Sequence, residues 1–382
     1  ESFQFLQKDM IDVGSAAYPL FGDVDNDGLE DILVGNYGYY DSSWYDATLS
    51  LHSEYVGKLA FFKNTGTANQ PEFLYITNDL ANISALKIKG IYPALGDLDG
   101  DGDNDLLCGK EDGKILFYRN EGLSGQTPDY QLITDEYQNI DVGSFSAPCL
   151  AKVNSDQLTD LVIGNKAGKL SFYLNTGSQQ NPVYILEDDF WGEINVTDPM
   201  FSNFGYSPPY TFHAQQGITR LLVGSEQGTI FYYPDILSHT GQAFPESDSL
   251  FSLVSDQPFE ILNGWRMSAS ITDLDDNGWL ELITGNLSGG LNFYPSSNQP
   301  GVSGLQESTP MIDMVRIYPN PANNSVHISL ENQLKATEIL IYNSLGEQLG
   351  IYDVQNKLHL NIDITNFVDG VYFVKIRSTV KP

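Results

Sequence analysis

Three segments of the chain carry the same nine-residue acidic pattern. They are Asp23-Val-Asp-Asn-Asp-Gly-Leu-Glu-Asp31, Asp97-Leu-Asp-Gly-Asp-Gly-Asp-Asn-Asp105 and Asp273-Leu-Asp-Asp-Asn-Gly-Trp-Leu-Glu281. Oxygen-bearing side chains at positions one, three, five and nine, with glycine at position six for a sharp turn, can surround a hard cation, and position seven can add its backbone carbonyl. The pattern predicts three calcium sites. The alternative is a solvated acidic turn that holds no metal.

The sequence around each acidic loop repeats as well. A short apolar strand precedes the first loop at 18–22, and a second strand that ends in glycine follows it at 31–35. Two weaker copies keep this frame. One has Lys152 at position one, and the other has Phe212, Ala214, Gln216 and Arg220 at the four ligand positions. Five units with first-ligand positions at 23, 97, 152, 212 and 273 favour a propeller or a solenoid.

Further short strands complete each unit. A third strand is expected at 58–64, 114–120, 169–175, 229–233 and 290–294, and a fourth follows at positions such as 73–76 and 183–186. Four short antiparallel strands make one propeller blade. The fifth unit lacks a fourth strand, so we expect the N-terminal segment 3–6 to complete it and close the ring.

The repeated units resemble the FG-GAP/VCBS repeats of integrin-like calcium-binding propellers, over residues 1–295. The resemblance implies that calcium is structural and is bound by positions one, three, five and nine, to which position seven adds a carbonyl. These residues are Asp23, Asp25, Asp27, Leu29 and Asp31; Asp97, Asp99, Asp101, Asp103 and Asp105; and Asp273, Asp275, Asn277, Trp279 and Glu281. Lys152 departs from the pattern. We expect its loop to be empty, with the ammonium paired to Asp156 and Asp160.

The C-terminal part has a different character. A linker at 296–313 precedes short alternating β-segments over 314–382, which predict a small Ig-like β-sandwich. This part resembles the type A sorting domain of the bacterial type IX secretion system, through Tyr318-Pro319-Asn320-Pro321-Ala322, Ile341-Tyr-Asn-Ser-Leu-Gly346 and Gly370-Val-Tyr372-Phe-Val-Lys375. The resemblance implies export across the outer membrane of a Gram-negative bacterium, to the cell surface or beyond. It also implies an outer-membrane pore, a shuttle barrel and a sortase as partners.

Composition narrows the possible partners. The chain has 50 acidic and 19 basic residues and a net charge of −31, so nucleic acid is not an expected partner. No apolar run is long enough to span a bilayer and no signal peptide is recognisable, so we expect a chain whose leader has been removed. Cys108 and Cys149 are expected to be buried free thiols, with a disulfide across neighbouring blades as the alternative.

No catalytic motif stands out. The five histidines lack metal-ligand spacing, and the sequence contains no nucleophile elbow, phosphate loop or Cys-x-x-Cys pair. We therefore expect a binding protein for glycan or protein. The alternative is a carbohydrate-active enzyme, a polysaccharide lyase or hydrolase, on a propeller scaffold.

Aromatic residues are expected on the face opposite the acidic loops. Strands alternate in direction within a blade, so the connections from strand two to three and from blade to blade share this face. They contain an insertion at 36–55 and two linkers rich in aromatic residues. We predict that Trp44, Trp191 and Trp265 contact the ligand. The alternative is that these rings fill space between long loops.

Overall fold

The computed structural model describes residues 13–296 except 155, 157, 214–218, 240, 248–249, 251–260 and 262–263. In the C-terminal part it describes 315–318, 325–330, 336–343, 348–354, 359–367 and 372–378. The described residues form two compact units, one over 13–296 and one over 315–378. The predicted strand at 3–6 and nearly all of the predicted linker lie outside the described residues.

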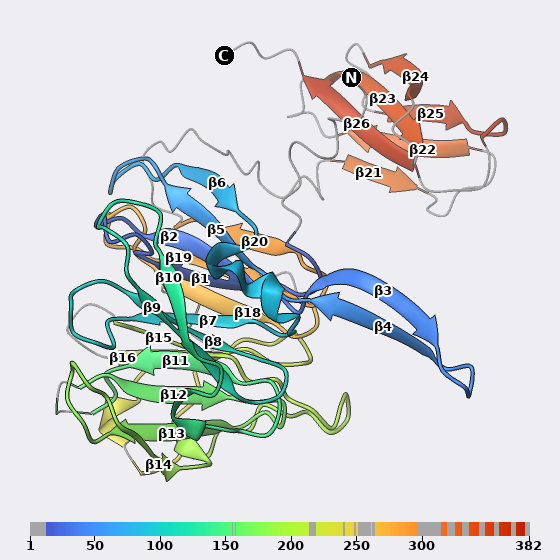
Figure 1. The fold of residues 1–382 in the computed structure, drawn as a ribbon. Helices are drawn as coiled ribbons and strands as arrows, with labels where there is room; N and C mark the ends of the chain where they lie inside the picture. Colours follow the sequence, from blue (N-terminus) through green and yellow to red (C-terminus); the bar gives the residue numbers. More distant parts are fainter. Residues whose placement is uncertain are drawn as a thin grey trace. The chain divides into compact units, whose positions relative to one another are not determined.

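The first unit is built from five antiparallel sheets that follow one another along the chain (Figure 1). Blades one to three each have four strands: β1 (Tyr18–Gly22), β2 (Asp31–Gly35), β5 (Leu59–Asn64) and β6 (Phe73–Thr77); β7 (Tyr92–Gly96), β8 (Asp105–Gly109), β9 (Ile115–Asn120) and β10 (Tyr130–Thr134); β11 (Ala147–Ala151), β12 (Asp160–Gly164), β13 (Leu170–Asn175) and β14 (Tyr184–Asp188).

Blades four and five have three strands each among the described residues. These are β15 (Pro209–His213), β16 (Thr219–Val223) and β17 (Phe231–Tyr233), then β18 (Ser268–Thr272), β19 (Glu281–Gly285) and β20 (Leu291–Tyr294). The described parts of the connections contain four short 3₁₀ helices: η1 (Leu80–Leu86), η2 (Tyr137–Asn139), η3 (Trp191–Glu193) and η4 (Leu237–His239). Within the described residues, the strands of the repeat therefore form where the sequence predicts them.

The blades form a closed ring, because blade five contacts blade one in the same way that blade one contacts blade two. The N–H of Ile91 donates to the carbonyl of Asn36 at 2.8 Å, and the N–H of Ala17 donates to the carbonyl of Asn286 at 3.0 Å. The first strand of each blade lies beside the first strand of the next, including β18 beside β1. The unit is an all-β, five-bladed propeller.

The glycine at the end of each second strand is explained by this contact between blades. A Cβ atom at Gly35 would overlap the carbonyl oxygen of Ile91, and a Cβ atom at Gly285 would overlap that of Ala17. The same overlap occurs at Gly109, Gly164 and Gly224. Only glycine allows adjacent backbones to approach so closely, so the repeated glycine is a requirement of blade packing.

The propeller core lies between the blades. Leu33 and Phe61 of blade one pack with Leu106 of blade two in one cluster of fully buried side chains. Cys108 belongs to this cluster, whereas Cys149 lies near the ring axis with its Sγ 3.4 Å from the Thr211 hydroxyl. Both cysteines are free and buried, so the disulfide alternative is wrong.

The second unit is a small β-sandwich. One sheet has the order β21 (Val315–Tyr318), β22 (Ser325–Leu330), β25 (His359–Asp363), and the other has β24 (Gln348–Asp353), β23 (Ala336–Asn343), β26 (Tyr372–Ser378). Ile328, Ile339 and Ile341 are buried between the sheets. Tyr318 ends β21 and Tyr372 begins β26. Pro319, Asn320, Pro321 and Gly370 lie outside the described residues.

Candidate functional site

The acidic loops connect the first and second strands of their blades, and their backbone conformation recurs. Positions four and six are left-handed in each, with φ of 59° at Asn26 and 89° at Gly28, and 54° at Asp276 and 87° at Gly278. Asn, Asp and Gly are the residues that adopt this conformation most readily. The carboxylate of Asp23 then accepts the N–H groups of Asp27 and Gly28, at 3.0 and 2.9 Å.

Each loop gathers three carboxylates that could hold a cation. Their nearest oxygens lie within 4.8 Å of one another in three sets: Asp23, Asp25 and Asp27; Asp97, Asp99 and Asp101; and Asp273, Asp275 and Glu281. Oδ1 of Asp25 and Oδ1 of Asp275 are buried and have no hydrogen-bond partner among the described residues. A buried carboxylate oxygen without a donor is costly, and a hard divalent cation such as calcium prefers oxygen ligands of this kind. The residues fit calcium.

The acidic side chain at position nine has a structural role. Oδ2 of Asp31 accepts the N–H of Val24 at 3.0 Å, and Oδ1 accepts the N–H of Asn64 at 2.7 Å. Asp105 and Glu281 make the equivalent pairs of bonds. Position nine therefore ties the loop to the end of the third strand, and only Glu281 also joins a gathered set.

Burial makes the negative charge of the position-nine carboxylates costly. The pKa of Asp31 is raised to about 7, mainly by burial and to a smaller extent by the charges of Asp25 and Asp27, despite the lowering effect of the two backbone N–H bonds. Burial likewise raises the pKa of Asp105 to about 6. A positive charge in the loop would offset this effect.

Blade one already has a positive charge at its loop. The ammonium of Lys63, at the end of β5, contacts the carboxylate of Asp25 and lies 2.7 Å from that of Asp27. The sequence prediction missed Lys63. Aligning the third strands by their terminal Asn64, Asn120 and Asn175 would have revealed that a basic residue precedes Asn64.

The blade-three loop corrects one prediction. Lys152 is exposed and makes no ion pair within 4.0 Å among the described residues, so it does not pair with Asp156 or Asp160. The amide of Asn154 donates to Asp160 instead, at 3.0 Å. Asn154 lies closer to Asp160 along the loop than Lys152 does, and its amide makes the contact with Asp160 that was expected of the lysine.

The acidic loops share their face with the connections between third and fourth strands, as the strand directions predict. The amide of Asn69 in blade one donates to the carbonyl of Asp275 in blade five, at 3.1 Å. The N–H of Gly125 in blade two donates to the carbonyl of Asp25, at 2.6 Å. Each of these loops is thus held by the neighbouring blade.

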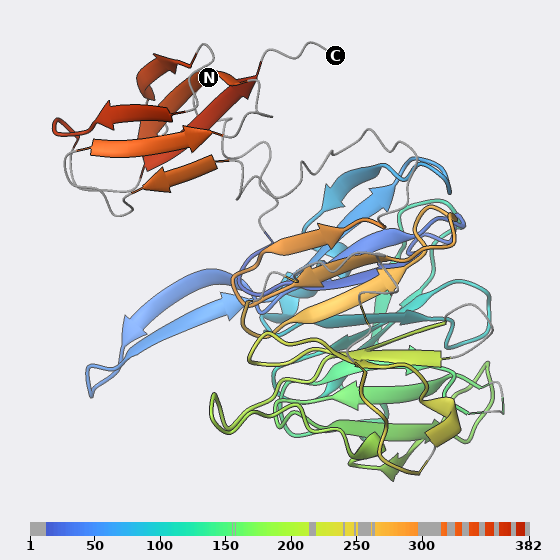
Figure 2. The ribbon, with the colours of Figure 1, turned by 180° about the vertical axis from the view of Figure 1, so that it is seen from behind.

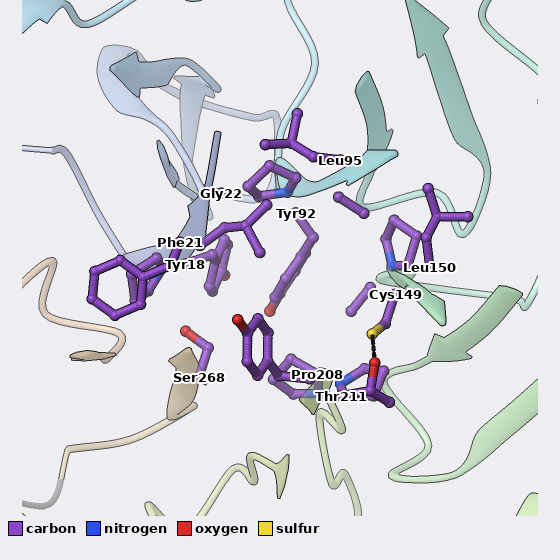
Figure 3. A pocket seen from close by; sticks show the side chains of 18 of the residues that line it. Tyr18, Phe21, Gly22, Tyr92, Leu95, Cys149, Leu150, Pro208, Thr211 and Ser268 are labelled. Carbon is purple, nitrogen blue, oxygen red and sulfur yellow. Dashed lines mark hydrogen bonds between the residues drawn. The ribbon is translucent and has the colours of Figure 1, made fainter. Parts of the chain in front are cut away.

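A cavity of about 330 Å³ lies among the first strands of all five blades (Figure 3). Leu95, Leu150 and Cys149 contribute to its wall, and Asp23 and Glu30 line it near the acidic loops. Tyr18 and Tyr92 also line it, and their rings stack with centroids 3.7 Å apart. The cavity is mostly walled by strand residues, and its lining also includes the polar side chains of Thr211, Ser268 and Thr272.

The opposite end of the first strands is filled by aromatic and charged side chains. Phe145, Tyr206 and Arg266 each precede the first strand of a blade in left-handed conformation, with φ of 55°, 48° and 53°. The Arg266 guanidinium lies 4.0 Å from the centre of the Tyr206 ring and its Nε is 2.9 Å from Glu226 Oε2. Left-handed backbone at large residues is strained, and such strain gathers at functional positions.

The three predicted tryptophans lie in different environments. Trp191 is only 4% exposed and packs between Phe172 and Phe244, with ring centroids 5.5 and 4.7 Å away. Its predicted role in ligand contact is wrong, because the ring fills the core. Trp265 is 58% exposed and meets the ring of Phe201 edge to face at 5.5 Å.

Phe201, Phe204, Trp265 and Lys166 form a surface that we call the Trp265 patch. Phe201 and Phe204 are half-exposed, and the Lys166 ammonium lies 4.2 Å from the centre of the Phe204 ring. All four residues lie in connections from strand two to three or from blade to blade, on the face opposite the acidic loops. The sequence prediction did not identify Lys166, whose partners come from a distant linker.

Trp44 lies on a separate hairpin. Strands β3 (Tyr39–Tyr45) and β4 (Leu51–Val56) pair only with each other and extend away from the blades (Figure 2). Trp44 is 45% exposed and stacks on His52, with ring centroids 5.6 Å apart. His52 Nε2 lies 2.8 Å from the Asp46 carboxylate, which orients the imidazole.

Comparisons with known proteins give one family. Residues 316–381 match the model described as a secretion system C-terminal sorting domain. A search of curated protein sequences finds no significant match. The FG-GAP/VCBS resemblance of residues 1–295 stays a prediction. Among the described residues, no helix has the length and apolar character to cross a membrane.

Two proteins are among the solved structures that match this chain at low similarity. One is a lectin of Agrocybe aegerita, described as recognising non-reducing terminal N-acetylglucosamine. It is 14% identical, with 95% of this chain and 85% of the lectin covered and a TM-score of 0.32. The other is AofleA from Arthrobotrys oligospora, at 9% identity, with 91% and 89% covered and a TM-score of 0.34. These scores are too low to bear on the ligand.

The sorting domain determines the location of the protein. Through this domain, the protein is exported by the type IX secretion system to the cell surface or the extracellular space.

Proposed function

We propose that the propeller is an extracellular recognition domain that binds a glycan through the Trp265 patch. The observation that carries this proposal is the exposure of three neighbouring aromatic side chains on one face. Trp265 is more than half exposed and contacts the half-exposed ring of Phe201, and the half-exposed Phe204 follows three residues later in the chain. Rings at a surface combine a large apolar contact area with little conformational entropy to lose, which suits stacking on the apolar faces of sugar rings.

Lys166 adds a polar group to the patch. Its ammonium lies over Phe204 and makes no ion pair among the described residues. Three N–H donors are therefore available to ligand hydroxyl or carboxylate oxygens. An apolar platform with a few placed donors is typical of small-ligand sites.

The hairpin supplies a second candidate contact. A two-stranded hairpin is only marginally stable by itself, and this one exposes Tyr45, Leu49 and Leu51 near its tip. One ring face of Trp44 is covered by His52, so the other can receive a ligand. We propose that the hairpin extends the binding surface beyond the Trp265 patch.

We propose calcium as the structural cofactor of the propeller. The gathered carboxylates of blades one, two and five would hold the ions, and the unpartnered oxygens of Asp25 and Asp275 support this assignment. Bound calcium would neutralise the carboxylates at each hairpin between the first and second strands. Ligands that bind only the folded state stabilise it, so calcium and folding are coupled.

A glycan array probed with the full chain in calcium tests the recognition function. Trp265→Ala and Phe201→Ala are expected to weaken binding at least about tenfold without changing the melting temperature, because both rings are exposed. Tyr75→Ala is the matched control, since Tyr75 is a half-exposed ring on outer strand β6.

Each other outcome identifies a different function. Unchanged glycan binding in both variants would exclude the patch. An empty array with capture of an extracellular protein by the same face would indicate a protein ligand. Cleavage of a bound polysaccharide by the full chain would support the enzyme alternative, and release of new chain ends measures it directly.

A further inference from the structure

Lys63 distinguishes the blade-one loop from the other acidic loops. Its ammonium contacts the carboxylates of Asp25 and Asp27, which belong to the gathered set of that loop. The position of Lys63 is fixed by its neighbour, because the N–H of Asn64 donates to the buried Asp31 at 2.7 Å. The end of β5 therefore places Lys63 within reach of the loop.

The corresponding residues of blades two and five do not reach their loops. Arg119 precedes Asn120 in the same way, but its guanidinium bonds to Glu121 on its own strand connection. In blade five, Pro295 precedes Ser296, whose N–H donates to Glu281 at 3.2 Å. Among the described residues, blade one alone combines a gathered carboxylate set with an ammonium in contact with it.

The Lys63 ammonium contacts only some of the carboxylate oxygens that gather in the blade-one loop. It binds Oδ2 of Asp25, while Oδ1 of the same side chain is buried and lacks a hydrogen-bond partner. Asp23 makes its bonds to backbone N–H groups of the loop and none to Lys63. Oxygens suited to a cation thus remain beside the lysine.

We propose that blade one carries an exchangeable cation site, in which Lys63 and a divalent cation compete for Asp25 and Asp27. This inference rests on the calcium binding proposed above. A calcium ion entering the loop must displace the ammonium or bind beside it, and each costs electrostatic free energy. Since the charge of the ligand set tunes calcium affinity, the blade-one site fills only at higher calcium than the sites of blades two and five.

The lysine also gives the loop a state without calcium. When no cation is bound in the blade-one loop, the Lys63 ammonium neutralises part of the charge of the gathered carboxylates, which would otherwise repel one another. The loop contacts blade two through the Asn104 amide, which donates to the Asp23 carbonyl at 2.8 Å. Blade one can therefore respond to the calcium concentration while the ring stays closed.

Calorimetric titration of the full chain with calcium, after chelation and dialysis, tests the proposal. The natural protein is expected to show two tight sites and a third that is about tenfold weaker or more. Lys63→Met is expected to tighten the third site by about tenfold, because it removes the competing charge. Lys63→Arg keeps the charge and should keep the site weak.

Arg119→Met is the matched control, since it removes the corresponding cation of blade two, and it should leave all three affinities unchanged. Three equal sites in the natural protein, or no change in Lys63→Met with an unchanged circular dichroism spectrum, would overturn the inference alone. No calcium binding by either protein would overturn the calcium proposal as well.

Discussion

The loops of blades one and three share a backbone frame but differ in their charged residues. In blade one, Asp31 accepts the N–H of Asn64 at 2.7 Å, and in blade three, Asp160 accepts the N–H of Asn175 at 2.8 Å. The first two strands pair in the same register, with Gly22 opposite Asp31 and Ala151 opposite Asp160. Blade three keeps this frame although Lys152 replaces the acid at position one.

The difference shows that the nine-residue pattern has two separable roles. Position nine binds backbone N–H groups and fixes the loop to the third strand, in every blade where it is acidic. Positions one and three gather the carboxylates that we propose hold a cation, and blade three has Lys152 and Asn154 at these positions. The structural role of position nine therefore does not depend on an acidic residue at position one.

Asp160→Ala tests the structural role and should have the largest effect. The substitution leaves the buried N–H groups of Asn175 and Val153 without an acceptor. Each unsatisfied buried donor costs about 1–3 kcal/mol, so we expect a loss of about 3–5 kcal/mol in the free energy of unfolding, measured with urea. The loss should be the same with calcium and with chelator.

Asp156→Ala is the control for this change, because Asp156 is exposed and accepts one N–H within its own loop, from Leu158 at 2.9 Å. We expect it to cost less than about 1 kcal/mol. Equal losses in the two variants would contradict the separate role of position nine.

Asp275→Asn tests the metal role in blade five. We expect it to lower the free energy of unfolding by about 2–3 kcal/mol in excess calcium, which is the stabilisation from a ligand at roughly a hundred times its Kd. In chelator the change should be neutral or stabilising, because it removes a buried charge from a repelling set. Thermal unfolding in both buffers measures this, and an equal loss in both would exclude metal binding at Asp275.

The sequence was sufficient to predict the strands and the blades. It was insufficient to predict which side chains contact one another in the loops. The spacing of strands, glycines and acidic residues predicts five blades, because blade packing requires the glycine at positions such as Gly35. Contacts between distant residues carry no such pattern. Trp191 is buried because Phe244 covers it, and Lys63 reaches Asp25 from another strand. The pairing predicted for Lys152 was wrong because the side-chain amide of Asn154, two residues away, donates the hydrogen bond to Asp160 instead.

The titration of Asp160 gives blade three a pH dependence that needs no metal. Burial raises the pKa of Asp160 from its ordinary value of 3.8 to about 6 in the folded protein. The folded state therefore binds the proton more tightly than the unfolded state. The stability that this proton contributes is present below about pH 4 and is lost as the pH rises through about 6.

We expect this contribution to be about 1–2 kcal/mol, measured as the difference in urea stability between the natural protein and Asp160→Asn across pH 4 to 7 in chelator. The amide of the Asp160→Asn variant cannot titrate. The free energy of unfolding of this variant is therefore lower but lacks this dependence on pH. Parallel pH profiles for the two proteins would contradict the role of Asp160.

The smallest expected effect is the restoration of a cation site in blade three. Lys152→Asp returns the acid at position one, beside Asn154 and Asp156 at positions three and five, but the loop has Gln157 where the other loops have glycine. The glycine of the other loops is left-handed, with φ of 89° at Gly28, so glutamine disfavours the turn that gathers the ligands. We therefore expect Lys152→Asp alone to add no calcium in calorimetry. The double variant with Gln157→Gly should add one calcium and about 1 kcal/mol of calcium-dependent stability. One added calcium in the single variant would show that charge, and not the turn, was the missing element.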